Sequence, residues 1–361
     1  MRIAQIIDAL EIGGAEKMAV NYANSLANTI EFSGLIATRK EGNLKSQIDK
    51  KVNYLFLARK KKIDIAAILR LRNYCKTNNV QYLQAHSSSY FTAFLVKMSY
   101  PKVKIIWHDH NGLSEFLSSR KEVFLKFASY FFTGIVVVNY KLKSWAETKL
   151  NCRNILYLPN FTTLNANENK STNLKGTSGK RILCLANLRF QKNHFLMLEV
   201  AKKLKNSHPD WSFHLVGKDF EDEYASKIKS EIVNNNLSEN VFIYGSKQDT
   251  QNCIEQSEIC ILTSQSEGLP VALLEYGLNK KPVVSTDVGE IPMIIKNENN
   301  GCIVSKFDAD NFYLSLVKLI ENQELRHFLG EALFETIVQN NSEKVVITNY
   351  LNWLDKIKHA E

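Results

Sequence analysis

Residues 2–27 read RIAQIIDALEIGGAEKMAVNYANSLA, and this stretch decides the fold class. It opens with a short apolar run, Ile3 to Ile7, which is typical of a buried strand. Gly13 and Gly14 follow, and apolar residues then recur at helical spacing from Met18 to Leu26. A strand, a glycine turn and an amphipathic helix in this order are the first half of a β-α-β unit.

The same alternation continues through the first half of the chain. Helical patterns, such as Ile63 to Tyr74, separate further short apolar runs. The most apolar stretch, Ser129 to Val138, is too short to span a membrane and indicates a core strand. The expected strands are Gly34 to Ala37, Tyr82 to Ala85, Lys104 to Trp107 and Ile135 to Val138. Strands that alternate with helices predict a parallel sheet covered by helices on both faces.

A second domain of the same class follows. Residues 165–180 are almost wholly Asn, Ser, Thr, Lys, Glu and Gly, so we expect a linker that buries no apolar surface. The expected strands beyond it are Arg181 to Ala186, Ser212 to Val216, Val241 to Tyr244, Glu258 to Leu262 and Pro282 to Ser285. After Asp308 the pattern is helical to the end.

These patterns predict an α/β protein of two doubly wound, Rossmann-like domains. We expect a first domain at 1–164, the linker at 165–180, a second domain at 181–342, and a helix at 343–361 that packs back on the first domain. Ligands of such sheets bind at the carboxyl ends of the strands, which predicts an active site between the domains.

Composition excludes several classes of protein. Hydrophobic residues make up 45% of the 361 residues and charged residues 23%, which argues against a disordered or fibrous chain. Gln5 and Asp8 interrupt the apolar start, so we expect no signal peptide and a cytoplasmic protein. Six cysteines without CxxC spacing predict buried free thiols.

Charge is distributed unevenly along the chain. Residues 1–160 contain 24 Lys and Arg against 11 Asp and Glu, a balance of +13, and the remaining 22 against 26 give −4. A basic half indicates an anionic partner such as a phosphorylated substrate, an acidic membrane surface or nucleic acid, with a solvated charged face as the alternative. Nucleic acid is least favoured, because regularly interleaved aromatic residues are missing.

Two carboxylates flank a predicted helix start in residues 264–277, SQSEGLPVALLEYG. We expect Ser264 or Ser266 to cap a helix that begins near Pro270. Glu267 then lies in the preceding loop and Glu275 on the helix, roughly 10 Å apart. A helix N-terminus between them suits a diphosphate, so the layout fits a sugar nucleotide.

This frame resembles a known family. Glu267 and Glu275 in E-G-L-P-V-A-L-L-E resemble the E-x7-E element of retaining glycosyltransferases of the GT-B fold, especially family 4, the glycosyl transferases group 1. Similar segments occur in the same order elsewhere: Gly13 to Glu16, Pro159-Asn160, Pro282 to Thr286 and Gly289 to Pro292.

The resemblance implies transfer of a sugar, with retention, from a nucleotide-sugar, probably a UDP-sugar. The resemblance makes 1–164 the acceptor-binding domain and 181–342 the nucleotide-sugar-binding domain. In it Glu275 binds the donor ribose and Glu267 lies against the transferred sugar. The Gly13-Gly14 loop and the backbone at Gly268, Leu269 and Pro270 would then help to hold the diphosphate.

Residues 186–193, ANLRFQKN, resemble the diphosphate loop of the family. Lys192 matches its phosphate lysine. The usual arginine is replaced by Asn187, and Arg189 is the nearest substitute. Two cations there would stabilise the charge that develops on the leaving diphosphate, so we expect no metal or other cofactor to be required.

Three histidines, His86, His108 and His110, follow strands of the first domain. The resemblance implies one histidine near the donor sugar; His108 and His110 both qualify, and we favour His108. With Asp109 the three could instead bind a metal ion in a hydrolase. A noncatalytic sugar-nucleotide-binding homologue is a third possibility.

Two further motifs concern charge. Asp308-Ala309-Asp310 resembles a metal-binding DxD motif, but we interpret it as a helix cap. Arg59 to Lys62 could contact anionic headgroups or a lipid diphosphate, or could be a solvated helix start. We expect a glycan or lipid-linked acceptor on the first domain, a role in surface polysaccharide synthesis, and peripheral attachment to the inner face of an anionic membrane.

Overall fold

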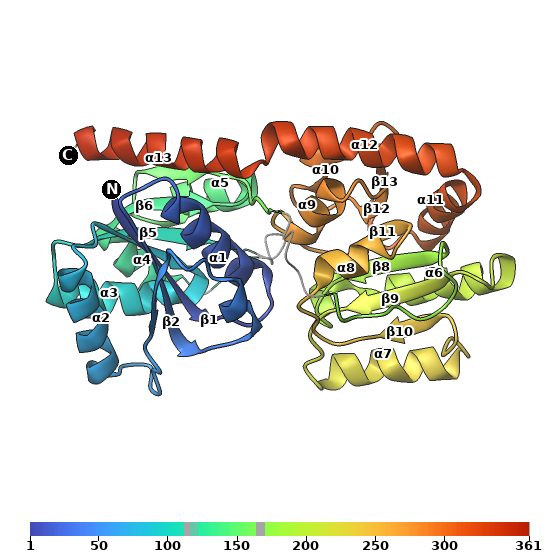
Figure 1. Cartoon of the computed structure of the whole chain (residues 1–361), viewed down its shortest axis with the longest axis horizontal. Coiled ribbons are helices and arrows are strands. Elements are labelled where there is room, and N and C mark those ends of the chain that lie inside the picture. Colours follow the sequence, from blue (N-terminus) through green and yellow to red (C-terminus); the bar gives the residue numbers. More distant parts are fainter. Residues whose placement is uncertain (112–116, 118–119, 121, 164–169, 361) are drawn as a thin grey trace. The chain divides into compact units, whose positions relative to one another are not determined.

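The computed structural model describes residues 1–111, 117, 120, 122–163 and 170–360 (Figure 1). The chain forms two compact units, each with its own parallel sheet. The first comprises Met1–Phe161 with Glu343–Glu361, and the second comprises Thr162–Ser342. The predicted pair of doubly wound sheets is confirmed.

The first unit contains a seven-stranded sheet in the order β3-β2-β1-β4-β5-β6-β7, with every neighbouring pair parallel. The first strand of the chain is therefore central, and the order reverses beside it. The strands are β1 (Arg2–Ala9), β2 (Phe32–Lys40), β3 (Asn53–Phe56), β4 (Tyr82–His86), β5 (Lys104–Asp109), β6 (Phe132–Val137) and β7 (Ile155–Tyr157). The apolar stretch from Ser129 is not all strand, because Ser129–Phe131 forms a turn of 3-10 helix, η4, before β6.

Helices cover both faces of this sheet. Apolar residues of α2, α3, α4 and α5 pack in one core, and those of α1 pack in another. The helices are α1 (Gly14–Ala27), α2 (Ile65–Thr77), α3 (Tyr90–Ser99), α4 (Val123–Ala128), α5 (Tyr140–Lys149) and α13 (Glu343–Ala360), with 3-10 turns η1 (Asn43–Gln47) and η2 (Ser87–Ser89).

The last helix, α13, belongs to the first unit although it follows the second in sequence. Its Tyr350 ring meets Tyr22 of α1 edge-on, with 5.4 Å between ring centroids. Its Trp353 ring leaves room only for glycine at Gly134 of β6, since a Cβ there would lie 2.5 Å from the ring. Figure 1 shows α13 running past α1 and α5. The helix thus completes the core of that unit.

The second unit contains a six-stranded sheet in the order β10-β9-β8-β11-β12-β13, again parallel throughout. Its first strand is also central. The strands are β8 (Arg181–Leu185), β9 (Ser212–Val216), β10 (Val241–Ile243), β11 (Ile259–Leu262), β12 (Val283–Thr286) and β13 (Cys302–Val304).

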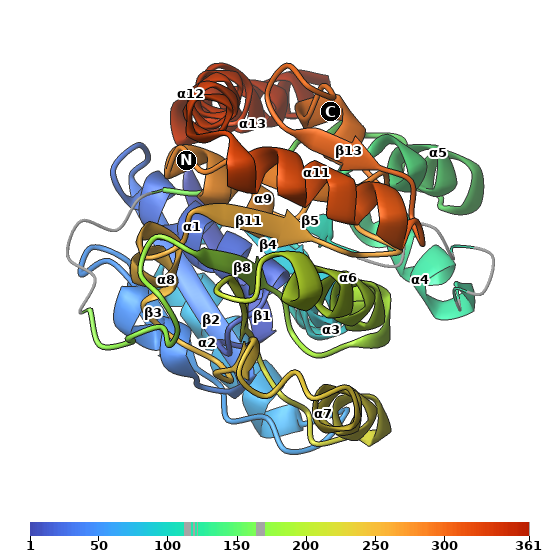
Figure 2. The same ribbon diagram turned by 90° about the vertical axis from the view of Figure 1, so that its right-hand side faces the viewer.

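Two groups of helices sandwich the second sheet. Apolar residues of α6, α7 and α11 share one core and those of α8, α9 and α10 share another; Figure 2 shows α6 and α11 on the same side. The helices are α6 (His194–Ser207), α7 (Glu223–Asn234), α8 (Thr250–Glu255), α9 (Val271–Leu278), α10 (Ile291–Ile294), α11 (Ala309–Glu321) and α12 (Gln323–Asn340), with the 3-10 turn η5 (Phe190–Lys192).

The polar segment before β8 differs from the expected linker. Positions 165–169 lie outside the described residues, but the part that follows packs on the second unit. Leu174 is 4% exposed, and the Asp249 carboxylate accepts hydrogen bonds from the backbone N–H groups of Ser171 and Thr172. Side chains of the unit satisfy the polar backbone, which allows this segment to bury an apolar residue.

Two expectations from composition can be compared with the fold. All six cysteines are buried and free, as predicted. Among the described residues, no helix is both long enough and apolar enough to cross a bilayer.

Candidate functional site

The loops after β8 and β11 lie where the strand order of the second sheet reverses. These two strands are neighbours in the sheet, and the chain leaves them in opposite directions. Ligands of doubly wound sheets bind at such a switch point, outside the carboxyl ends of the strands. The loop after β8 carries Arg189 and Lys192, and the loop after β11 carries Ser264 and Glu267.

Lys192 and Glu267 meet at this point. The Lys192 Nζ lies 2.5 Å from Glu267 Oε1, and the Ser264 hydroxyl donates to the same oxygen at 2.6 Å. Glu267 is 5% exposed. A mostly buried carboxylate is therefore held by a cation and a hydroxyl, as a buried charge requires.

Hydrogen bonds between the two loops hold this pair in register. The Gln265 backbone N–H donates to Gln191 O, and its side-chain amide donates to Phe190 O, both at 2.9 Å. The Thr263 hydroxyl donates to Lys192 O at 3.0 Å. Lys192 thus has its backbone, as well as its side chain, tied to the loop of Glu267.

Glu275 lies on α9, as expected, but the helix begins differently. Its N-cap is Pro270, which makes no side-chain cap, so neither Ser264 nor Ser266 caps it. Ser264 instead uses its hydroxyl on Glu267. The prediction of a serine cap was wrong because α9 begins at Val271, too far along the chain for Ser264 or Ser266 to be the residue before its first turn.

Two residues of the next β-α loop, Gly289 and Glu290, contact the backbone of Glu267 and Gly268. The Glu290 N–H donates to Gly268 O at 2.9 Å. Gly289, with φ of +58°, approaches so closely that a Cβ would lie 2.4 Å from Glu267 O. Leu269 fills the core beneath at 3% exposure. The loop from Glu267 to Pro270 is therefore packed on both sides.

The Arg189 side chain packs on Phe220, in the loop after β9. Its guanidinium stacks over the Phe220 ring, 4.4 Å from the centroid. Asn187, at the position of the family arginine, accepts a hydrogen bond from the Lys218 backbone N–H at 2.7 Å. Asn187 therefore holds the loop after β9, which accounts for an amide at this position.

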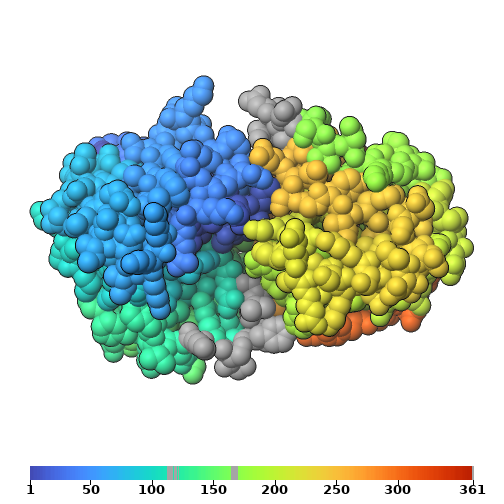
Figure 3. All heavy atoms as spheres, turned by 90° about the horizontal axis from the view of Figure 1, so that it is seen from below, coloured from blue at the N-terminus to red at the C-terminus, as the bar shows by residue number. Residues whose placement is uncertain are grey.

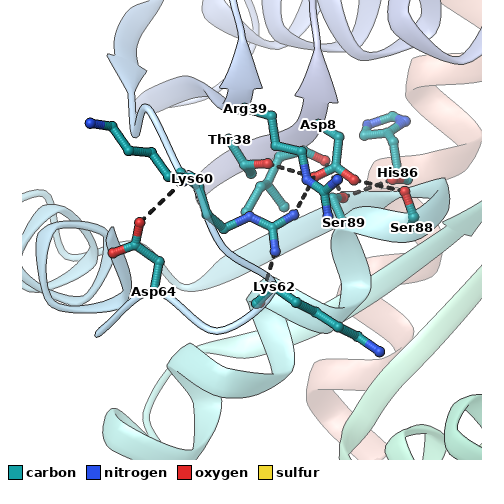
Figure 4. A network of polar contacts seen from close by, with 11 residues as sticks. Asp8, Thr38, Arg39, Lys60, Lys62, Asp64, His86, Ser88 and Ser89 are labelled. Atoms are coloured by element: carbon teal, nitrogen blue, oxygen red, sulfur yellow. Dashed lines mark hydrogen bonds and ion pairs between the residues drawn. The ribbon is translucent and has the colours of Figure 1, made fainter. Parts of the chain in front are cut away.

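In the first sheet the switch point lies between β1 and β4. Asp8 of β1 accepts hydrogen bonds there from Thr38 and from Ser88, the latter at 2.8 Å (Figure 4). Its Oδ1 lies 3.1 Å from Arg59 Nη2. Arg59 is 7% exposed and also donates to Lys62 O at 3.0 Å. We did not identify Asp8 from the sequence; its place near the carboxyl end of the central strand was the available signal.

The glycine pair opens α1. Gly13 is the N-cap, with extended backbone and no side-chain cap, and Gly14 is the first helical residue. A Cβ on Gly13 would lie 2.3 Å from a carboxylate oxygen of Glu16 in the first turn. Glycine therefore leaves space that the Glu16 side chain occupies, where its charge complements the helix dipole.

The three histidines converge beside the same switch point, with one ligand atom from each within 4.8 Å of the others. His86 Nε2 lies 2.8 Å from Gln5 Oε1, and His86 Nδ1 lies 2.8 Å from His110 Nε2. His108 Nδ1 lies 3.0 Å from the Gln84 amide nitrogen.

These contacts determine the tautomers. An amide oxygen only accepts, so His86 carries its proton on Nε2 and its Nδ1 accepts from His110 Nε2. His110 then presents Nδ1 as an acceptor. By the same logic His108 carries its proton on Nε2, which is buried and has no hydrogen-bond partner. Gln5 and Gln84 therefore orient the group.

Burial keeps these rings neutral. It lowers the pKa of His86 and His108 well below the ordinary value, and it lowers the pKa of His110 to about 3. Neutral imidazoles are competent metal ligands. Asp109, which the hydrolase hypothesis places with them, forms an ion pair with Arg120 instead, with N–O distances of 2.6 and 3.0 Å.

The Asp308-Ala309-Asp310 motif is a helix cap, as predicted. Asp308 accepts from the Asn311 N–H at 2.9 Å and caps α11. Asp310 pairs with Lys203 on the surface at 2.6 Å.

Comparison with known proteins identifies the family. Residues 165–335 match the family described as Glycosyl transferases group 1. A UDP-Gal:alpha-D-GlcNAc-diphosphoundecaprenol alpha-1,3-galactosyltransferase of Escherichia coli is 23% identical over 96% of this chain and 93% of its own. A poly(ribitol-phosphate) alpha-N-acetylglucosaminyltransferase of Staphylococcus aureus is 28% identical over 44% of this chain and 31% of its own.

Solved structures share the fold. A mutant of Staphylococcus aureus TarM, in complex with fondaparinux, alpha-GlcNAc-glycerol and UDP, has a TM-score of 0.81 at 14% identity and covers 98% of this chain and 99% of its own. Anabaena HepE, in complex with UDP and glucose, has a TM-score of 0.80 at 13% identity, with the same coverage. Residues 165–335 therefore match the glycosyl transferases group 1, and the chain is a sugar-transferring enzyme with the GT-B fold of two doubly wound domains.

Proposed function

We propose that this enzyme transfers a sugar from a UDP-sugar to an acceptor hydroxyl, with retention of anomeric configuration, in the synthesis of a surface glycan. One observation carries the proposal: Lys192 and Glu267 meet, 2.5 Å apart, at the switch point of the second sheet. A cation for a diphosphate and a carboxylate for a sugar are thus adjacent where such sheets bind ligands.

Each donor contact has a residue suited to it. Lys192 binds the diphosphate, and the backbone of Gly268 to Pro270, before the uncapped start of α9, binds it from the other side. Glu275 accepts hydrogen bonds from the ribose hydroxyls. Arg189 joins the diphosphate only if it leaves its stack on Phe220.

The Lys192–Glu267 pair suggests how the donor is received. An incoming diphosphate competes with Glu267 for the lysine, so the carboxylate becomes available to the sugar hydroxyls. As the bond from the sugar to the diphosphate oxygen breaks, Lys192 stabilises the charge that develops on that oxygen. The acceptor oxygen bonds to the same face of the sugar, and its proton passes to the leaving phosphate. No step requires a metal ion.

We also propose that the Gly13-Gly14 loop and one histidine, all in the first unit, contact the donor. Sequence reasoning favoured His108, but His108 is 1% exposed whereas His110 is partly exposed. His110 also has Nδ1 as an acceptor, which suits a sugar hydroxyl. We therefore assign the sugar contact to His110 and a supporting role to His108.

The acceptor is a glycan carried on a lipid diphosphate. The Escherichia coli relative is named for such an acceptor, alpha-D-GlcNAc-diphosphoundecaprenol. The +13 balance of residues 1–160 suits an anionic acceptor and attachment of a cytoplasmic enzyme to the inner face of an anionic membrane.

The proposed function is tested by measuring the melting temperature of the full chain with each of a set of nucleotide-sugars. A ligand at 100 times its dissociation constant adds about 2.7 kcal/mol to stability, so the correct donor raises the melting temperature. Lys192→Ala should abolish the rise, whereas Lys203→Ala, on an exposed pair of the same unit, should retain it. A product with inverted anomeric configuration would refute retention.

The histidine group is the observation that favours the metal-dependent alternative. Its test is chelation. We expect turnover to survive EDTA, because Lys192 supplies the positive charge. Full loss, restored by zinc or manganese, would favour the hydrolase hypothesis. Donor binding without either turnover or donor hydrolysis would favour a noncatalytic homologue.

A further inference from the structure

Exposed apolar side chains gather on and beside α4 of the first unit. Val123 is 86% exposed, Phe127 is 52% exposed, and Tyr130, in the following turn, is 70% exposed. We call these three residues the apolar ridge. Large apolar groups so open to water usually mark a contact with another apolar body.

Ring contacts connect the ridge to a neighbouring basic loop. The exposed rings of Phe127 and Phe124 contact each other, with centroids 6.3 Å apart, and both pack on the buried Phe94 of α3. Phe124 lies 5.2 Å from Phe91, and the Lys62 Nζ lies 5.4 Å from the centroid of that same ring. The apolar ridge and Lys62 therefore belong to one continuous surface.

The charge of this surface has one sign. Lys60, Lys61 and Lys62 are exposed, and α2, α3 and α4 contain five basic residues and no acidic one. The five are Arg70, Arg72, Lys76, Lys97 and Lys126. The nearest acids are engaged: Asp64 caps α2, and Glu122 lies 3.5 Å from Lys149. In Figure 3 the segment that contains α2, in light blue, forms part of the outer surface of the unit.

The basic loop is held firmly at the carboxyl edge of the sheet. Arg59 donates to Lys62 O and to Asp8, so it ties the loop to the central strand (Figure 4). Asp64 accepts from the Lys60 N–H at 3.2 Å. The lysines are therefore presented on a braced turn beside the switch point of the first sheet.

We propose that this surface docks on an anionic lipid bilayer, with the side chains of Val123, Phe127 and Tyr130 inserted below the headgroups and Lys60 to Lys62 on the headgroup phosphates. The proposal rests on the membrane attachment proposed above. It adds insertion of apolar side chains to the attraction between lysines and headgroups. Basic residues around an apolar patch match an acidic interface, because charge attracts the protein to the headgroups and insertion adds apolar burial.

This orientation has a consequence for the acceptor. The basic loop and the N-terminal end of α3 follow the carboxyl ends of β3 and β4. Because Arg59 ties the basic loop to Asp8, contact of Lys60 to Lys62 with the headgroups brings Asp8 toward the headgroup layer. A diphosphate on a lipid would then reach the enzyme without leaving the membrane.

The main test is co-sedimentation of the full chain with vesicles of phosphatidylcholine, with and without 30% phosphatidylglycerol. Lys60, Lys61 and Lys62 changed together to Gln should weaken binding roughly 100-fold at low salt. Val123→Asn with Tyr130→Asn should weaken it roughly tenfold. The matched controls are three Lys→Gln changes at the exposed residues Lys344, Lys356 and Lys358 of α13, and Leu314→Asn with Phe328→Asn in the second unit, all expected to bind like the wild type.

A second measurement reports insertion directly. Phe127→Trp should give fluorescence that shifts to the blue on anionic vesicles and is quenched by brominated lipid, above the signal of the four native tryptophans. Salt-sensitive binding without quenching would overturn insertion. Equal binding to neutral vesicles would overturn the charge requirement. Loss of self-association, rather than of vesicle binding, in the Val123→Asn and Tyr130→Asn variant would make the ridge a protein interface and refute the proposal.

A separate measurement distinguishes failure of the membrane proposal from failure of the proposed function. Stabilisation by a UDP-sugar without vesicles should be unchanged in the ridge and lysine variants. If the wild type binds vesicles as described but no nucleotide-sugar, only the proposed function is refuted.

Discussion

Replacing Lys192 with alanine removes the ammonium group that lies 2.5 Å from Glu267 Oε1. At an effective dielectric constant near 20, the Coulomb attraction at this separation is about 7 kcal/mol, but desolvation offsets most of it. Couplings between contacting charged residues are usually about 0.5–3 kcal/mol. The Lys192 side chain is 21% exposed and that of Glu267 is 6% exposed, so we expect a coupling of about 1–2 kcal/mol.

The two single variants should differ. Lys192→Ala leaves a mostly buried carboxylate without its ammonium partner, and we expect a loss of about 2–3 kcal/mol. Glu267→Gln leaves a lysine that can turn to water, and an amide that still accepts from Ser264, so the loss should be about 1 kcal/mol. In a unit of this size the melting temperature falls about 2–4 °C per kcal/mol, which gives 4–12 °C for Lys192→Ala.

Thermal unfolding of both variants and of the double variant, without ligand at pH 7.5, measures these differences. Lys203→Ala is the matched control, because its pair with Asp310 is exposed and should shift the melting temperature by less than about 1 °C. A coupling below about 0.5 kcal/mol, or a greater loss in Glu267→Gln than in Lys192→Ala, would refute the reasoning.

Three further predictions concern turnover, acid stability and backbone packing. Glu275→Ala should raise KM with little change in kcat, and Glu267→Ala should lower kcat, as steady-state kinetics would show; the reverse pattern would contradict the assigned roles. Burial lowers the pKa of His194 and His214 to about 3, so the folded chain binds fewer protons than the unfolded chain between pH 6.5 and 3. Stability should therefore fall below pH 6.5 by about 1.4 kcal/mol per histidine per pH unit, and a melting temperature that is constant from pH 7.5 to 5.5 would exclude this. Gly289→Ala should destabilise the second unit by more than about 1 kcal/mol, since a Cβ would meet the Glu267 carbonyl, and wild-type melting would contradict the close approach.

Local patterns predicted most of the long strands and helices. Short apolar runs and a period of 3.6 residues are properties of neighbours in sequence, so β1, β4, β9 and their helices could be recognised. The strands β3, β7 and β13, three or four residues long, were missed, although β10, of three residues, was recognised. The cap of α9 was misjudged because the loop before it is shaped by Gly289 and Glu290, from the next β-α unit.

The sequence by itself determined which residue types stand at the ends of which strands, including Lys192 after β8, Glu267 after β11 and the histidines at the ends of β4 and β5. Only the tertiary structure decided their partners: Glu267 for Lys192, Phe220 for Arg189 and Arg120 for Asp109. It also brought Arg59 to Asp8 across 51 positions of sequence. The physical reason is that periodicity reports which side of an element is buried, whereas ion pairs and tautomers depend on which strands become neighbours when the sheet assembles.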